Sequence, residues 1–118
     1  MIDKMTPQEF VDVIRLVVSD AAISDTIDVI SSPPGRRPDK KLVEISEFYN
    51  QQDTAEKKHI EEIIKKSVEE AVFGFFCVLD GVRAIEDSGR KGELSLIYEG
   101  NMTTKLNGDA NLHDLYNN

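Results

Sequence analysis

The sequence predicts an α+β protein that is mostly helical, with about four helices around a long central helix, a C-terminal β-hairpin and a short terminal helix. Residues 53–86 begin as an amphipathic helical pattern and become almost wholly apolar from Ala71 to Leu79, which is typical of a helix entering a core. Residues 93–106 partly alternate around Gly100-Asn101, which is typical of a hairpin.

The first helix is expected to start at Thr6-Pro7-Gln8-Glu9, where Thr6 caps, Pro7 takes the first helical position and Glu9 completes a capping box. Ser24-Asp25-Thr26 is a site where a second short helix could restart, and this helix must end before Pro33. The apolar face predicted for the first helix consists of Phe10, Val13, Ile14, Val17, Val18 and Ala21.

Residues 31–38 hold three of the four prolines, so we expect an irregular internal loop there. A further helix then carries Leu42, Ile45, Phe48 and Tyr49, and ends at Asn50 or Gln51.

The central helix is predicted over residues 54–84, from a second capping box at Asp53-Thr54-Ala55-Glu56. Gly74 and Gly81 mark either a close helix crossing or a break, and the competing interpretation of residues 72–79 is a buried strand. Phe75, Cys77 and Leu79 are predicted core residues. The inward positions expected along this helix are Ile60, Ile63, Ile64, Val68, Ala71, Val72, Phe75, Leu79 and Val82.

The C-terminal segment is predicted to form strands over residues 93–99 and 102–106, joined by a two-residue turn at Gly100-Asn101. Asn107-Gly108-Asp109 breaks the second strand, and Asp109 or Asn111 caps a last turn that pins Leu112, Leu115 and Tyr116 to the core.

Length and charge bound the class of protein. We expect the 118 residues to form a single domain over 1–118, and the net charge of −8 disfavours nucleic acid and anionic membranes while favouring a basic partner. The longest uncharged run, Ala71–Leu79, is too short to span a bilayer, and the N-terminus lacks a signal-peptide pattern. The single cysteine, Cys77, suits a reducing cytoplasm.

The sequence contains no coherent catalytic set, so we expect neither enzymatic activity nor a cofactor. Glu56, His59 and Glu62 follow a metal-ligand spacing, but no second helix supplies a matching set, and an exposed ion-pair face is expected instead. His113-Asp114 could pair with Asp109 as acid and base, although a structural terminal helix is favoured.

Two charged clusters remain as candidate contact surfaces. Asp80, Arg83, Glu86 and Asp87 follow the apolar segment and could bind a partner, form a buried Asp80–Arg83 pair or cover a solvated helix end. The basic loop at 36–41 could bind a phosphate or an acidic partner, but solvation is the simpler interpretation.

The segments FGFFCVLDGVRAIED (73–87), GELSLIY (92–98) and LNGDANLHDLYNN (106–118) resemble small bacterial immunity proteins of secreted or contact-delivered toxin systems. The resemblance implies a stoichiometric inhibitor without a cofactor that binds a cognate toxin, and the net acidity suits a basic toxin domain. The alternative function is a structural or regulatory protein that assembles with itself, for example as a homodimer.

Overall fold

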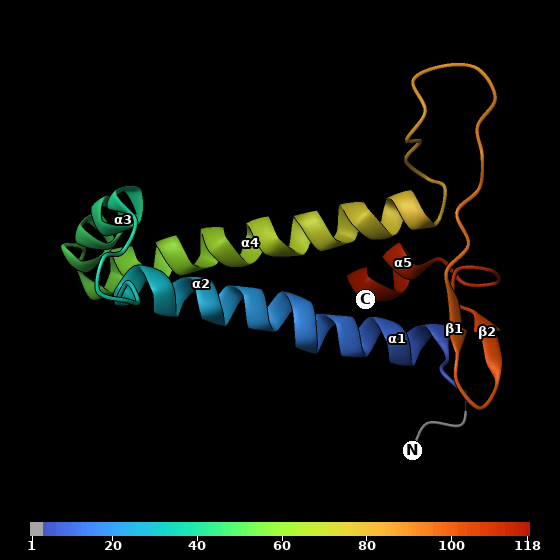
Figure 1. Cartoon of the computed structure of the whole chain (residues 1–118), viewed down its shortest axis with the longest axis horizontal. Helices are drawn as coiled ribbons and strands as arrows, with labels where there is room; N and C mark the ends of the chain where they lie inside the picture. The colour runs from blue at the N-terminus through green and yellow to red at the C-terminus, as the bar shows by residue number, and fades with distance from the viewer. Residues whose placement is uncertain (1–3) are drawn as a thin grey trace. The chain divides into compact units, whose positions relative to one another are not determined.

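The computed structural model describes residues 4–118 and confirms the mostly helical α+β fold (Figure 1). Three consecutive helical segments open this part of the chain and follow one another without a break; two more helices, a hairpin and a short terminal helix complete it. The elements are α1 (Pro7–Ile14), the π-helix η1 (Arg15–Asp20), α2 (Ala21–Ser31), α3 (Lys40–Asn50), α4 (Thr54–Leu79), β1 (Ile97–Glu99), β2 (Thr103–Lys105) and α5 (Leu112–Asn117).

The described residues form two compact units. The first unit contains the chain up to Val18 together with Glu70–Asn118, and the second contains Ser19–Glu69. The continuous helical run from α1 to α2 and helix α4 therefore each contribute residues to both units. The expectation of a single domain over residues 1–118 stays a prediction.

The first helix begins where the sequence predicts. The Thr6 hydroxyl accepts a hydrogen bond from the Glu9 N–H at 3.1 Å, and Pro7 occupies the first turn. No restart occurs at Ser24-Asp25-Thr26, because these residues lie within α2. The predicted apolar face is wrong in part: Val13, Val17 and Val18 are exposed, whereas Val11 is completely buried.

The second unit contains α2, α3 and the first part of α4. Asp39 caps α3 by accepting hydrogen bonds from the Lys41 and Leu42 N–H groups. The buried Tyr49 hydroxyl donates to the Glu61 carboxylate at 2.7 Å, and this hydrogen bond, together with burial, raises the pKa of Tyr49. This contact ties α3 to α4 within the unit.

Helix α4 begins with the predicted capping box and is helical throughout residues 72–79, which excludes the strand interpretation. The Glu56 N–H donates to the Asp53 carboxylate at 2.8 Å, and the Asp53 N–H donates to the Glu56 carboxylate at 2.9 Å. The predicted end at residue 84 is wrong because Gly81 adopts a φ of +79°. The Val82 N–H donates to the Cys77 carbonyl at 2.9 Å, which completes a Schellman motif.

The hairpin is shorter than predicted. Strands β1 and β2 pair antiparallel with Glu99 opposite Thr103, so three residues, not two, connect them. Beyond the strands, the Leu106 N–H donates to the Leu96 carbonyl at 2.8 Å. The side-chain amide of Asn107 donates a hydrogen bond to the Leu79 carbonyl at 2.6 Å, which joins the hairpin to the end of α4.

The core of the first unit lies between α1, α4 and α5, and Figure 1 shows α5 between the other two. Val11, Phe76, Leu112 and Tyr116 form its buried cluster. The Phe76 ring meets the Phe10 ring edge to face at a centroid distance of 6.3 Å and the Tyr116 ring at 5.4 Å.

The predicted core positions of α4 are corrected at several sites. Cys77 is buried and Leu79 is partly buried, but Phe75 is 62% exposed while its neighbour Phe76 is 2% exposed. Adjacent residues point about 100° apart on a helix, so only one of the two rings can face α1 and α5. The inward predictions are also wrong at Ile63, Ala71 and Val82, which are exposed, whereas Ile60, Ile64, Val68 and Val72 are partly buried.

Candidate functional site

An apolar groove in the first unit is the best-formed candidate site. It has a volume of about 420 Å³ and exposes no polar atom. Helix α1 and η1 supply one wall, the last turns of α4 supply the other, and a residue next to β1 closes one side. The lining residues are Phe10, Ile14, Val18, Ala71, Val72, Phe75, Phe76, Leu79 and Leu96.

The groove follows from how the core is filled. Helix α5 packs Leu112 and Tyr116 against Val11 and Phe76, and none of its residues lines the groove. Phe10 and Phe76 therefore lie between the core and the groove, and α5 covers them on the core side only. Phe75 also lines the groove, and most of its ring is in solvent.

Further apolar side chains are exposed on the same helices. Val13, Leu16 and Val17 of α1 and η1 are all at least 40% exposed, and none of the three lines the groove. Large contiguous apolar patches on a protein surface mark interaction sites or ligand grooves. With no titratable group in its lining, the groove can bind apolar surface but has no group to perform acid, base or nucleophilic chemistry.

The structure also shows a buried carboxylate directly after α4, where the sequence favours a solvated helix end. The Asp80 side chain is 0% exposed. Its Oδ2 accepts hydrogen bonds from the His113 backbone N–H at 2.9 Å and lies 2.6 Å from His113 Nδ1. The second ring nitrogen of His113, Nε2, lies 3.4 Å from the Asp114 carboxylate oxygen Oδ1.

The Asp80–His113 contact joins the end of α4 to the first turn of α5. Asp80 follows α4 directly, and it satisfies a first-turn N–H of α5 that the Asn111 side chain does not cap. Of the alternatives considered for this cluster, the buried Asp80–Arg83 pair is wrong, because the partner of the buried Asp80 carboxylate is His113. No sequence signal links the two residues, because 33 positions separate them and only the packing of α5 brings them together.

The other predicted contact residues lie in the segment after α4. Arg83 and Asp87 are exposed, and the Arg83 guanidinium lies beside Gly74 of α4. The Glu86 carboxylate accepts a hydrogen bond from the Gly92 N–H at 2.6 Å, which lowers the pKa of Glu86. In the described part of the chain, no hydrogen bond or ion pair joins Asp80, Arg83, Glu86 and Asp87 to one another.

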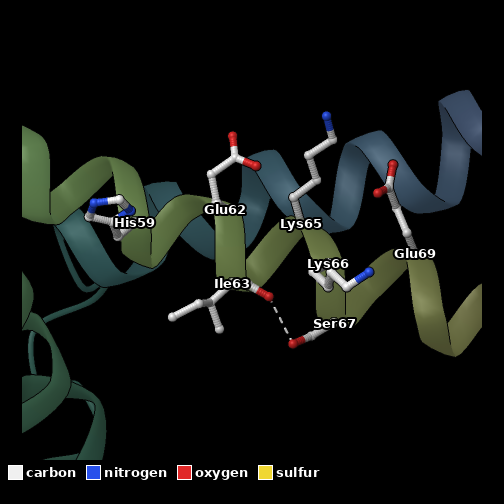
Figure 2. Close-up of a pocket in the computed structure, with 7 residues that line it drawn as sticks. All are labelled: His59, Glu62, Ile63, Lys65, Lys66, Ser67 and Glu69. Atoms are coloured by element: carbon white, nitrogen blue, oxygen red, sulfur yellow. Dashed lines mark hydrogen bonds between the residues drawn. The ribbon is translucent and has the colours of Figure 1, made fainter.

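A shallow hollow, whose lining residues are mostly charged or polar, runs along α4 in the second unit (Figure 2). All of its lining residues come from this helix, and Figure 2 shows the His59 and Glu62 side chains projecting separately from the ribbon. Glu56 is occupied by the capping box with Asp53. Within residues 4–118, no group of three or more histidine, cysteine or acidic residues is placed to hold a metal ion.

The basic loop also lies in the second unit. Arg36, Arg37, Lys40 and Lys41 are all exposed, and Lys41 forms an exposed ion pair with Glu44 at 3.4 Å. Exposed pairs of this kind contribute little to stability. The positions of these side chains do not define a binding site.

Comparison with known proteins does not identify a relative: no protein-family model, curated protein or solved structure matches this chain. Among the helices of the described residues, none combines the length and the apolar character that a membrane span requires.

Proposed function

We propose that this protein is a binding module that acts by stoichiometric association with another protein through the apolar groove. The observation that carries the proposal is the set of exposed large apolar side chains around the groove, with Phe75 at 62% exposure on an otherwise well-formed helix. Leaving such a ring in water sacrifices about 1–2 kcal/mol of the burial free energy available to it, which a partner surface would recover.

The proposal has a narrower form, in which the protein is an immunity protein that neutralises a toxin by occupying it. The acidity of the chain supports this form because a basic toxin domain would meet it faster by electrostatic steering. The buried free thiol of Cys77 is compatible with a reducing compartment, so the proposal includes a cytoplasmic location. It includes no catalysis and no cofactor.

A matched pair of variants tests the proposal. Phe75→Gln removes the exposed ring at the groove, while Ile63→Gln removes a similarly exposed side chain of the same helix, 66% exposed, outside the groove. Each tagged protein is used to co-purify partners from the organism that encodes it, and light scattering gives the stoichiometry of the complex. We expect the wild type and Ile63→Gln to retain a partner in a fixed ratio, and Phe75→Gln to lose it.

The same experiment addresses the self-assembling alternative, which the exposed apolar residues of the groove also favour. A stable homodimer of the purified wild type that dissociates in Phe75→Gln, with no foreign partner retained, would replace the proposed function with self-assembly. A monomer that captures no protein in a Phe75-dependent way would contradict both functions.

A further inference from the structure

We propose that the charge of His113 controls how firmly α5 is held on the first unit, with α5 attached more tightly when the imidazole ring carries its second proton. The contact lies outside the apolar groove, so this control is independent of the function proposed above. Three features of the first unit support it: the buried Asp80 carboxylate, the groups that surround the His113 ring, and the dependence of α5 on its contacts.

The Asp80 carboxylate is the first feature. Its side chain is completely buried, and Oδ2 accepts the hydrogen bonds from His113, whereas the buried Oδ1 accepts none. A buried carboxylate is unfavourable unless a cation or several hydrogen bonds compensate its charge. In the described part of the chain, His113 is the one basic residue that pairs with Asp80. The charge of Asp80 is therefore compensated in full only when His113 is charged as well.

The groups around the His113 ring are the second feature. Nδ1 lies 2.6 Å from Asp80 Oδ2 and Nε2 lies 3.4 Å from Asp114 Oδ1, so a carboxylate faces each nitrogen. An imidazolium can donate to both carboxylates, whereas a neutral ring donates from one nitrogen only. The Phe73 ring of α4, which meets the imidazole edge to face at a centroid distance of 5.8 Å, carries no charge. Partial burial of the imidazole opposes its charge, but the carboxylate beside it is buried more completely and gains a counter-charge.

The third feature is that α5 depends on its contacts with the rest of the unit. It has six residues, and a helix of this length is not stable in water by itself. Leu112 and Tyr116, on either side of His113 in the chain, bury their side chains in the core. Asp80 also accepts the His113 backbone N–H, so the pair fixes the first turn of α5 to the end of α4. A weaker pair therefore lets this short helix open more often.

A second polar contact holds the other end of α5 and does not respond to pH near neutrality. The Arg15 guanidinium of η1 donates to the Tyr116 carbonyl and lies 4.2 Å from the centroid of the Tyr116 ring. An arginine in a protein keeps its charge. Histidine is the side chain that ordinarily changes charge between about pH 5 and 8. A response of α5 in this range therefore comes from the Asp80–His113 pair, and α5 loosens as the pH rises and the ring loses its proton.

Hydrogen exchange of the α5 amides measures the attachment of this helix. The exchange is followed by NMR between about pH 5.5 and 8 and corrected for the intrinsic pH dependence of exchange. We expect the protection factors of the His113 and Leu115 amides to fall by about tenfold as the pH rises, because a charge-assisted hydrogen bond is roughly twice as strong as a neutral one. The carbon-13 shifts of the His113 ring, recorded on the same samples, should report loss of the proton over the same pH interval.

The chain contains two histidines, which provides a matched control. His113→Gln keeps the backbone N–H and a neutral side-chain donor, so the protection of α5 should no longer depend on pH. His59→Gln removes the exposed histidine of α4 in the second unit and should leave the pH dependence of the wild type unchanged. Asp80→Asn keeps a hydrogen-bond acceptor without the negative charge, and the fall in protection should again be absent.

Three results would overturn the inference. They are protection that stays constant while the His113 ring loses its proton, protection that falls while the ring keeps one charge state, and a fall that persists in His113→Gln. If the substitutions at His113 and Asp80 leave α5 unprotected at every pH, the wild-type comparison of ring shifts with protection still decides the question, because it needs no substitution. Capture of a partner through Phe75 is a separate measurement, so either proposal can fail without the other.

Discussion

Replacing Phe76 with alanine should destabilise the protein strongly, while the same change at the adjacent Phe75 should have little effect. Phe76 is 2% exposed and belongs to the buried cluster of α1, α4 and α5, so its replacement removes nearly a whole ring from the core. Substitutions of this kind cost about 3–5 kcal/mol. The loss includes two edge-to-face ring contacts, with Phe10 and Tyr116, each contributing about 0.5–1.5 kcal/mol.

At Phe75 the balance is different. The ring is 62% exposed, so alanine removes little buried surface, and alanine favours a helix more than phenylalanine does. We therefore expect a change in the free energy of unfolding within about 1 kcal/mol. The same sequence context surrounds both residues, which makes Phe75→Ala a matched control.

Urea titrations followed by far-ultraviolet circular dichroism measure both variants. Small domains are stable by only about 5–15 kcal/mol, so a loss of this size is enough to unfold part of the Phe76→Ala population in water. Phe76→Leu keeps most of the volume and should lose about 1–2 kcal/mol. Comparable small losses at Phe75 and Phe76, or a larger loss at Phe75, would show that α4 presents the opposite face to the core and would refute the argument for the groove.

Three further predictions concern α4, α5 and the second unit. Gly81→Ala should cost about 1 kcal/mol in a denaturant titration, because φ of +79° strains any residue with a Cβ; no loss would contradict the assigned end of α4. Asp80→Ala should cost about 1–3 kcal/mol of unfolding free energy and speed hydrogen exchange of the α5 amides, since it leaves the His113 N–H without its acceptor. Unchanged protection of these amides would show that the Asp80–His113 contact does not hold α5 in place. The raised pKa of Tyr49 predicts that stability is complete below the ordinary tyrosine value of about 10 and falls as pH rises through the higher folded-state value. Absorbance titration of tyrosinate in wild type and Tyr49→Phe checks this, and ionisation of Tyr49 at the ordinary pH would mean that the hydrogen bond to Glu61 is absent.

The helix boundaries that depend on local chemistry could be predicted from the sequence. Thr6 and Asp53 cap the helices that they precede, and Pro7 occupies the first turn, because these effects operate within one helical turn. The sequence marks Gly81 as a position for either a helix break or a close helix crossing and does not distinguish the two. Its positive φ decides in favour of a break.

The buried face of α4 near its C-terminal end could not be predicted, because residues 71–79 are apolar all around and carry no periodic signal. The position of α5 selects Phe76 for the core and leaves Phe75 in solvent. The predicted contact cluster had the same limitation: Asp80 reads as the first residue of a solvated end, but α5 returns to bury it against His113.

The sequence by itself therefore determined the helical class of the chain, its caps, the hairpin and the acidic balance, since each depends on neighbouring residues or on composition. Only the tertiary structure decided that Phe10, Ile14, Phe75 and Leu79 meet around a groove. These residues come from segments about 60 residues apart, and the free energy of loop closure depends so weakly on loop length that the sequence separation does not determine which segments meet. The exposure of a side chain depends on what packs against it. Helix α5 packs against one side of α1 and α4, and this buries Val11 and Phe76 and leaves the groove between α1 and α4 open to solvent.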